Sequence, residues 1–492
     1  MLSVLVAHSY FLRFDQKQLQ RAKPYPPLAT LQVAARLRSA GHRVAMFDAM
    51  LAEGTDEYAT LVESERPQLA LFYEDNFNYL SKMCLARMRQ ATCDMIASAR
   101  RAGARVIVGG SDASDAPEAY LAAGAEVVLI GEGLVALRAL VQRLDTDCRQ
   151  PAGALTSGLT EVASVADDRL NLHRGPARPD HEQPGLPAWD LIDVERYRST
   201  WQAAHGYFSL NMAASRGCSF RCHWCAKPIW GNRYLQRRPD DVAREMTYLK
   251  HALRPDHIWF ADDIFGFRVD WVEAFTHSID AADGRVPFTI QTRADLVTSG
   301  MARALSRAGC REVWLGAESG SQRVLDAMNK GTSVDEIVAA RARLKAEGIR
   351  VGFFIQLGYL GEQLEDILGT RDLIDGARPD DIGVSVSYPL PGTHFYDLVK
   401  EQLKAKTHWR ESNDLAMMFE GTYTTEFYRA IRDLLHEQVA LDDRGLPMVD
   451  ENHARDLLAR RWQHLIAEER HYRNRTPEVS ALAWPAPGLQ ST

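Results

Sequence analysis

The chain has 492 residues, of which 46% are hydrophobic and 25% are charged, and this composition predicts a globular protein with two or three domains. Its 58 basic and 65 acidic residues give a net charge of −7, which favours a small-molecule substrate over nucleic acid as the main partner. No apolar run approaches the roughly 20 residues that span a bilayer, so no transmembrane segment is expected. Seven cysteines, an odd number with three close together, favour a reducing cytoplasm over a disulfide framework.

Residues 1–145 alternate short apolar runs with amphipathic stretches of helical period. This alternation predicts a flavodoxin-like, doubly wound α/β domain with a parallel sheet, in which ligands bind at the carboxyl ends of the strands. Glycine-rich turns follow two of the runs, where missing side chains let a large ligand approach the backbone. The predicted strands are 3–8, 43–50, 69–75, 105–110 and 126–133.

Residues 146–205 are rich in proline, glycine, aspartate and arginine, and they predict a linker or a surface strap. A second βα series fills residues 206–394, and its six strands predict a partial TIM-like barrel with the active site at their carboxyl ends. Residues 395–492 have a mainly helical pattern and are expected to cap the barrel. The predicted barrel strands are 209–215, 257–262, 288–293, 312–318, 350–358 and 381–388.

The segment after the first barrel strand places Cys218, Cys222 and Cys225 at the spacing CxxxCxxC. Three thiolates on one short loop can hold three irons of a 4Fe-4S cluster, and no fourth cysteine lies at a matching distance. The fourth iron would then be open to a ligand that offers an amine and a carboxylate. A zinc site that adds His223 is the alternative, although zinc ligands are usually spaced as two separated pairs. The other cysteines are expected to be small hydrophobic residues: Cys84, Cys93, Cys148 and Cys310.

This loop, with Trp224 directly before its third cysteine, resembles the radical S-adenosylmethionine (SAM) superfamily. The resemblance implies that the open iron binds the methionine part of SAM. It also implies that an electron from the cluster splits the cofactor and leaves a 5′-deoxyadenosyl radical. The three cysteines would be both cluster ligands and catalytic residues, and an electron donor such as flavodoxin or ferredoxin would be needed.

Further motifs resemble the branch of this superfamily that carries an N-terminal cobalamin domain, and the similarity covers about residues 1–440. They are the acidic pair in 260–265, the Thr292-Arg293 pair, the Glu-Ser-Gly run in 316–321 and the proline–glycine turn in 389–393. Arg293 could pair with the SAM carboxylate, and Glu318 could accept hydrogen bonds from its ribose or amine. An ordinary ion pair is the alternative for each charged residue. The expected SAM-binding residues are Trp224, Asp262, Gln291, Arg293, Glu318, Gln356 and Leu390.

The N-terminal domain resembles cobalamin-binding domains in the segments 25–29, 37–42, 108–110 and 130–133. It lacks the DxHxxG loop whose histidine ligates cobalt in many such proteins, because His8 has neither the aspartate before it nor the glycine after it. The resemblance therefore implies cobalamin bound without a protein histidine on its lower face. A domain that kept the fold and lost the cofactor is the alternative. The expected cobalamin-binding residues are Ala7, His8, Tyr73, Glu74, Asn76, Gly109, Gly110, Ser111, Gly131, Glu132 and Gly133.

Three reactions fit this domain order. The first is methylation of an unactivated carbon of a small-molecule or lipid-like substrate. The second is an oxidative cyclisation or rearrangement of a tetrapyrrole-like or natural-product substrate, as in the anaerobic magnesium-protoporphyrin ester cyclase that the chain resembles. The third is a non-catalytic iron–sulfur redox protein. A methylthiotransferase is less attractive, because that family has extra N-terminal cysteines for a second cluster.

Aromatic and methionine residues gather in the C-terminal segment. They would either form an adaptable apolar surface for a substrate or, as we favour for most of them, the core of a helical bundle. These residues are Met417, Met418, Phe419, Tyr423, Phe427 and Tyr428.

Overall fold

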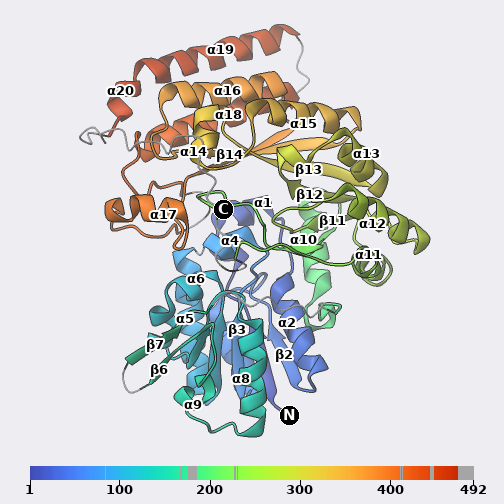
Figure 1. The fold of residues 1–492 in the computed structure, drawn as a ribbon, viewed down its shortest axis with the longest axis vertical. Coiled ribbons are helices and arrows are strands. Elements are labelled where there is room, and N and C mark those ends of the chain that lie inside the picture. The colour runs from blue at the N-terminus through green and yellow to red at the C-terminus, as the bar shows by residue number, and fades with distance from the viewer. Residues whose placement is uncertain are drawn as a thin grey trace, which may run out of the picture. The chain divides into compact units, whose positions relative to one another are not determined.

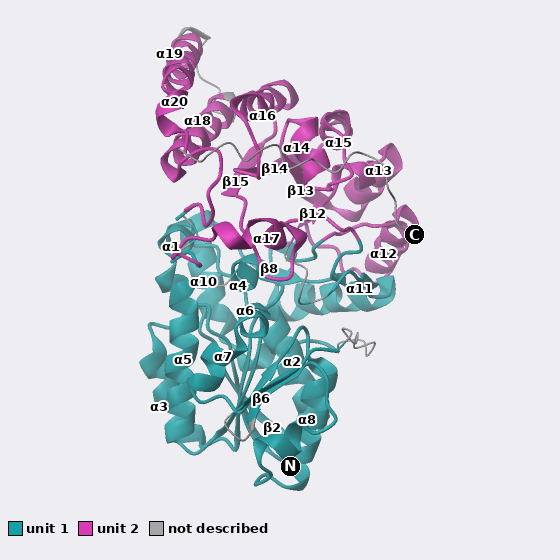
Figure 2. Ribbon diagram, turned by 60° about the vertical axis from the view of Figure 1, so that its left-hand side comes forward, with its two compact units in different colours: residues 1–219, 226–263, 408–414 teal, residues 220–225, 264–407, 415–492 magenta. Residues whose placement is uncertain are grey.

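The structure is a computed structural model, and the chain in it divides into two compact units (Figure 2). Unit 1 comprises residues 1–219, 226–263 and 408–414, and unit 2 comprises residues 220–225, 264–407 and 415–492. The predicted domain boundaries at 145, 205 and 394 stay predictions. The residues that the structure describes are 1–83, 85–166, 169–175, 185–225, 229, 231–410, 412, 414–443 and 448–474.

Unit 1 contains a seven-stranded sheet with the order β2-β1-β3-β4-β5-β6-β7 (Figure 1). Its first five strands are parallel and have the flavodoxin-like order, as predicted. All five side chains of the central β3 are buried, which is expected of a parallel strand covered on both faces. The strands are β1 (Ser3–Ala7), β2 (Arg43–Phe47), β3 (Leu69–Tyr73), β4 (Arg105–Gly109) and β5 (Val127–Leu129), and the main helices are α2 (Leu28–Ser39), α3 (Thr55–Glu65), α5 (Ala86–Arg101) and α8 (Leu134–Thr146).

The segment 146–205, predicted to be a linker or strap, is partly regular structure. It contributes β6 (Val162–Ala166) and β7 (Arg169–His173), which extend the sheet in antiparallel fashion from β5. It also forms α9 (Ala152–Thr156) and α10 (Val194–His205). Strand β7 is largely exposed, so it leaves no clear apolar run in the sequence.

The second sheet has six strands in the order β15-β14-β13-β12-β11-β8, which are the six predicted strands. The pairing of β8 with β11 and the pairings from β12 to β15 are parallel, so the predicted α/β fold with a partial barrel is confirmed. The strands are β8 (Ser209–Met212), β11 (His257–Phe260), β12 (Phe288–Thr292), β13 (Cys310–Glu318), β14 (Arg350–Leu357) and β15 (Asp381–Val386).

In unit 2, helix α15 (Val334–Ala346) packs against β13 and β14 (Figure 1). Alternate side chains of these strands are buried on the face that this helix covers. Val313 and Leu315 of β13 and Val351 and Phe353 of β14 are fully buried there. We call the opposite side of this sheet the inner face. Helix α15 begins in a capping box, in which Ser333 and Glu336 satisfy each other's backbone N–H groups. The covering helices are α13 (Ser299–Ala308), α15 (Val334–Ala346) and α16 (Leu364–Ala377).

The described part of the C-terminal segment is mainly helical, as expected. The six aromatic and methionine residues singled out in this segment are at most 5% exposed, which supports the interpretation that they belong to a core: Met417, Met418, Phe419, Tyr423, Phe427 and Tyr428. The tail after residue 476 lies outside the described residues. Among the described helices, none is long and apolar enough to cross a membrane. The helices are α17 (His394–Val399), α18 (Thr425–Asp443), α19 (Met448–Ala467) and α20 (Glu469–Tyr472).

Gly320, just after β13, is required by a close backbone approach. A Cβ at this position would lie 2.1 Å from the carbonyl oxygen of Gly369 in α16. We therefore expect Gly320→Ala to lower the free energy of unfolding by about 2 kcal/mol or more, because backbone atoms must move apart. Gly376→Ala in α16 is the control: its Cβ meets no atom of the described residues within 4 Å, so it should leave stability unchanged or raise it. Denaturant unfolding of both variants measures the difference, and an unaffected Gly320→Ala would contradict the packing described here.

Candidate active site

The cysteine loop follows a two-residue strand, β9 (Ser215–Arg216), and begins at Gly217, whose φ of +74° favours glycine. Cys218 is buried, whereas Cys222 and Cys225 are partly exposed. The N–H of Cys225 donates to the carbonyl of Cys222 (3.3 Å), so the end of the loop is a tight turn. The buried indole N–H of Trp224 has no hydrogen-bond partner among the described groups. The loop therefore offers thiols together with an unused donor.

Arg293, at the end of β12, lies against this loop. Its Nη1 is 3.7 Å from the Sγ of Cys222, and its guanidinium lies 3.7 Å above the ring of Phe220. Its other donors bind Asp295 and the backbone carbonyl of Lys330. Protein groups therefore occupy most of the guanidinium. The geometry supports a cation held beside the sulfur of Cys222. The pairing of Arg293 with a SAM carboxylate stays a prediction.

Glu318 ends β13 with a φ of +61°, a left-handed conformation that is costly for a residue other than glycine. The strand has a bulge between Gly316 and Glu318. The Oε1 of Glu318 accepts a hydrogen bond from the Nζ of Lys330 (2.8 Å), and both side chains are 6% exposed. Burial lowers the pKa of Lys330, but the neighbouring Glu318 and Cys222 charges outweigh it and raise the pKa above its usual value. The sequence analysis missed Lys330, which lies in a loop after α14 (Gln322–Ala327) and carries no motif signal.

Asp262 is predicted to bind SAM, but the structure gives its carboxylate other partners. Its oxygens accept hydrogen bonds from the hydroxyl of Ser215 (2.5 Å) and the N–H of Ala214 (3.0 Å), and it is 1% exposed. Burial raises its pKa to about 7, although these two hydrogen bonds lower it. The geometry supports a positioning role: Asp262 holds the backbone just before the cysteine loop.

Three further residues predicted to bind SAM lie at strand ends, as expected. Gln291 of β12 is partly exposed, and its carbonyl accepts from the N–H of Phe265. Gln356 of β14 is buried and donates to the hydroxyl of Ser387 (2.9 Å). Leu390 is 6% exposed in the turn after β15. Of these, Gln291 is the most accessible.

His223, the fourth ligand in the zinc hypothesis, is engaged elsewhere. Its Nδ1 lies 3.1 Å from the carbonyl oxygen of Ala327, and its ring is 4.3 Å from that of His394. Burial and then the neighbouring His394 lower its pKa. Across the described part of the chain, no three His, Cys, Asp or Glu side chains converge as a single metal ion requires. A 4Fe-4S cluster has no such requirement, because each thiolate binds a different iron.

Cys310 begins β13 and cannot be a fourth cluster ligand. Its thiol donates to the carbonyl of Glu312, and burial raises its pKa above the usual thiol value. Glu318 ends the same strand, so Cys310 lies roughly 26 Å away from that end at about 3.3 Å per residue. The described cysteines of unit 2 are Cys222 and Cys225 of the CxxxCxxC loop and Cys310. The three loop cysteines thus fit a 4Fe-4S cluster in which one iron has no cysteine ligand.

Two residues predicted to bind cobalamin, His8 and Glu74, are occupied by other contacts. His8 is fully buried, and its Nε2 lies 3.0 Å from both the carboxylate of Asp48 and the N–H of Ala49. Glu74 accepts from the N–H and hydroxyl of Ser9, and burial raises its pKa. The geometry of Glu74 does not support contact with a ligand. The buried Nδ1 of His8 has no hydrogen-bond partner among the described groups, so its contact with cobalamin stays a prediction.

The neighbouring strand ends are tied together in the same way. The hydroxyl of Tyr73 donates to the carbonyl of Glu132 (2.8 Å), and the Glu132 carboxylate is paired with Arg216. A Cβ at Gly110 would lie 2.7 Å from Cγ of Glu74, so this glycine makes room for a side chain. These contacts account for the residue types at the carboxyl ends of the unit 1 strands, which we call the rim, without a ligand.

Other rim groups do fit a large ligand. The buried Oδ1 of Asn76 has no partner among the described groups and could accept a hydrogen bond from a ligand amide. Gly131 has a φ of +72°, and among the described residues a Cβ there would approach the carbonyl of Ile229, at 3.4 Å. Gly109 and Ser111 lie on either side of the turn into α6 (Ser111–Asp115), Gly133 caps α8, and Ala7 ends β1. The rim therefore fits cobalamin through backbone approach and amide contacts.

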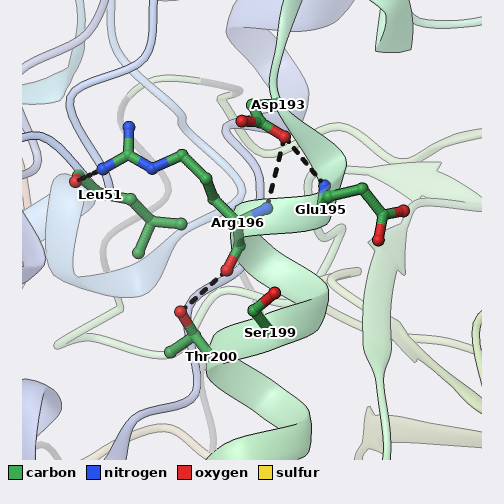
Figure 3. A pocket seen from close by; sticks show the side chains of 6 residues that line it. All are labelled: Leu51, Asp193, Glu195, Arg196, Ser199 and Thr200. Carbon is green, nitrogen blue, oxygen red and sulfur yellow. Dashed lines mark hydrogen bonds between the residues drawn. The ribbon is translucent and has the colours of Figure 1, made fainter.

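Figure 3 shows a surface pocket of unit 1 at the start of α10. Asp193 caps that helix by accepting the N–H groups of Glu195 and Arg196, and the guanidinium of Arg196 donates to the carbonyl of Leu51. The pocket contains none of the predicted site residues. We assign it no role.

Two family models match the chain: the B12 binding domain over residues 19–141 and the radical SAM superfamily over residues 212–374. The chain therefore carries a radical SAM domain and a B12-binding domain. The cofactors of these domains are a 4Fe-4S cluster, SAM and cobalamin. The radical SAM match includes the CxxxCxxC loop, and the B12 match includes β3 and β4.

An uncharacterized methyltransferase of Pyrococcus horikoshii is 24% identical over 314 residues, which are 62% of this chain and 65% of that protein. A putative methylthiotransferase of Methanocaldococcus jannaschii is 28% identical over 273 residues, which are 53% of this chain and 57% of that protein. This chain spans less than two thirds of the length of either relative. The radical SAM methyltransferase TsrM from Kitasatospora setae, solved with cobalamin and a 4Fe-4S cluster, has a TM-score of 0.66 at 19% identity, over 81% of this chain and 74% of that one. This likeness shows a shared fold.

The buried pair of Glu318 and Lys330 gives a stability prediction. Lys330→Met leaves the Glu318 carboxylate buried without its cation, so we expect a loss of about 3–5 kcal/mol in the free energy of unfolding. The double variant Glu318→Gln/Lys330→Met should recover part of this loss, because no charge is then left unpaired. The exposed Lys345→Met is the control and should change stability by less than about 0.5 kcal/mol. Denaturant unfolding compares the variants, and equal losses in the single and double variants would contradict the pairing.

Glu362, which follows β14, is a buried carboxyl that the sequence analysis did not single out. Its Oε2 accepts from the N–H of Gly358 (2.7 Å), whereas its Oε1 and the hydroxyl of Tyr428 have no hydrogen-bond partner among the described groups. Burial raises its pKa to about 8, although the Gly358 hydrogen bond lowers it. The carboxyl is therefore mostly protonated at neutral pH.

This raised pKa predicts a pH-dependent effect of Glu362→Gln. An unfolded chain releases the Glu proton near pH 4.3, about the usual value, while the folded protein keeps it up to about pH 8. Wild-type stability therefore falls across this window, by up to about 1.4 kcal/mol per pH unit, and the glutamine variant escapes this loss. The Tm of Glu362→Gln relative to wild type should rise from about pH 5 to about pH 8 in thermal unfolding. The exposed Glu365→Gln should show no such rise, and a flat difference for Glu362→Gln would contradict the assignment.

Proposed function

We propose that this protein is a radical SAM enzyme that, with cobalamin, methylates an unactivated carbon of a small-molecule or lipid-like substrate. The observation that carries the proposal is the pairing of a B12-binding domain with a radical SAM domain whose Cys222 has a cation beside it. The names of the relatives, which include a methyltransferase of Pyrococcus horikoshii, support methyl transfer. The cobalamin domain is proposed for residues 1–145, the barrel for 206–394 and the helical cap for 395–492.

When bound, the cluster and SAM supply a 5′-deoxyadenosyl radical, and cobalamin supplies a methyl group. The residues of this chain would hold these groups in a protected site. Cys218, Cys222 and Cys225 would bind the cluster, and Arg293 would offset its negative charge next to Cys222. Lys330 would fix Glu318 so that its free oxygen can accept a hydrogen bond from SAM.

We propose Trp224, Gln291, Glu318 and Gln356 as the SAM contacts that the geometry favours. Trp224 has an unused buried donor, and Gln291 is accessible at its strand end. For cobalamin we propose Asn76 and the backbone around Gly109, Gly131 and Gly133. Asp262, His8 and Glu74 would act indirectly, because each holds a neighbouring backbone or side-chain group in place.

The competing reactions differ in their residues or products. The likeness to a putative methylthiotransferase raises the question of a second iron–sulfur cluster in the N-terminal domain. Of the N-terminal cysteines that the structure describes, Cys93 is half-buried in α5 and Cys148 is exposed after α8, so these two do not form a cluster site. Cys84 lies outside the described residues. An oxidative cyclase would share the barrel residues and differ in stoichiometry. A cytoplasmic location and a donor of the flavodoxin or ferredoxin type complete the proposal.

The decisive experiment is anaerobic reconstitution with iron, sulfide and cobalamin, followed by analysis of the products from SAM. A methylase forms 5′-deoxyadenosine together with S-adenosylhomocysteine, a cyclase forms 5′-deoxyadenosine alone, and an electron carrier forms neither. We expect Cys218→Ala to abolish the cluster and both products, because one of three iron ligands is lost. Cys310→Ala is the matched control and should retain iron, visible absorption and products. A cluster that survives Cys218→Ala, or wild type without 5′-deoxyadenosine, would refute the proposal.

A further inference from the structure

A buried ion pair joins the rim of the B12-binding domain to the short strand that precedes the cysteine loop. The carboxylate of Glu132 is paired with the guanidinium of Arg216, and the two side chains are 9% and 11% exposed. Glu132 lies in the turn after β5, whereas Arg216 is the last residue of β9. Both residues belong to unit 1, so the contact lies within one compact unit.

The turn that carries Glu132 is part of the rim that we propose to contact cobalamin. Gly131 and Gly133 on either side of it have φ values of +72° and +62°, so the backbone bends sharply there. The hydroxyl of Tyr73 donates to the carbonyl of Glu132 (2.8 Å), and the N–H of Gly131 donates to the hydroxyl of Ser114 (2.9 Å). The neighbouring strand ends therefore hold the backbone of this turn, while the partner arginine holds its carboxylate.

The other end of the ion pair lies next to the first cluster cysteine. Cys218 follows Arg216 after a single glycine and is 6% exposed. The strand β9 pairs in antiparallel fashion with β10 (Leu235–Gln236). The hydroxyl of Ser215, the residue before Arg216, donates to the carboxylate of Asp262 (2.5 Å). The Glu132 carboxylate therefore acts on a well-fixed backbone segment two residues before Cys218.

Net stability is a weak explanation for this ion pair. Burying two charges removes their hydration, and an apolar pair of similar volume is often at least as stable. A charged hydrogen bond does fix the distance and direction between the two segments that carry it. The pair is therefore better explained by the position that it imposes on the rim and on the start of the cysteine loop.

We propose that Glu132 and Arg216 are positioning residues that couple the binding of cobalamin to the binding of the 4Fe-4S cluster. The inference goes beyond the proposed reaction and rests on the proposed contact of cobalamin with the backbone at Gly131 and Gly133. The turn that carries Glu132 is fixed when cobalamin binds, and Cys218 is fixed when it binds iron. Because the ion pair needs both ends in place, each cofactor raises the affinity of the protein for the other.

The dissociation constant of hydroxocobalamin tests this coupling. It is measured by anaerobic isothermal titration on the reconstituted protein and again after a chelator has removed the cluster. We expect the cluster to tighten hydroxocobalamin binding by about fivefold or more in wild type. Glu132→Gln removes one charge with little change of shape, and it should reduce this factor to less than about twofold. The double variant Glu132→Gln/Arg216→Gln leaves no charge unpaired and should show the same loss of coupling.

Glu126→Gln is the matched control. Glu126 lies directly before β5 and pairs with Arg105 at the amino ends of β4 and β5, where its side chain is 19% exposed. The variant therefore breaks another ion pair of the same sheet, at the end opposite to the rim. It should keep the full effect of the cluster on hydroxocobalamin binding, because neither cofactor site is attached to this pair.

Equal affinity of wild type with and without the cluster, or no binding of hydroxocobalamin at all, would overturn the inference. An undiminished factor in folded Glu132→Gln or in the folded double variant would do the same, as would an equal loss of coupling in Glu126→Gln. Thermal unfolding establishes that each variant is folded.

The binding measurement needs no turnover of SAM, so its result is independent of the reaction. A protein that forms 5′-deoxyadenosine and S-adenosylhomocysteine but shows no coupling refutes this inference alone. A protein that shows the coupling and forms neither product refutes the proposed function alone.

Discussion

A positive charge held beside Cys222 is the constraint around which the site in unit 2 is organised. Arg293 can stay there because Asp295 and the backbone carbonyl of Lys330 occupy its other donors. The same Lys330 uses its side chain to hold Glu318. One chain of contacts therefore fixes the end of β12, the end of β13 and the cysteine loop together. In a setting with little solvent, such fixed charges act strongly on an anionic cluster.

The strands of both sheets could be predicted because most are parallel and buried, and such strands leave continuous apolar runs in the sequence. The fully buried β3 (Leu69–Tyr73) is the clearest case. The hairpin of β6 and β7 could not be predicted in this way. Strand β7 is largely exposed, and the hairpin joins the sheet through the pairing of β6 with β5. That pairing is a tertiary contact that local composition does not record.

Sequence spacing could place the candidate site residues at strand ends but could not give their partners. Asp262, Glu74 and His8 lie where the motifs put them, yet internal hydrogen bonds occupy them. Spacing fixes the position of a residue and leaves the direction of its side chain open. Lys330 is the converse case. It follows no motif, and only the return of the loop after α14 brings its ammonium group to Glu318.

The strained backbone of Glu318 is held by the contacts of the charged site. Its left-handed backbone costs of order 1–3 kcal/mol and persists because the pair with Lys330 and the close approach of Gly320 to Gly369 hold it. The bulge beside it brings the paired carboxylate and ammonium over Gly316, where any side chain would collide with them. A side chain at Gly316 would therefore displace the two groups that hold the strained backbone of Glu318.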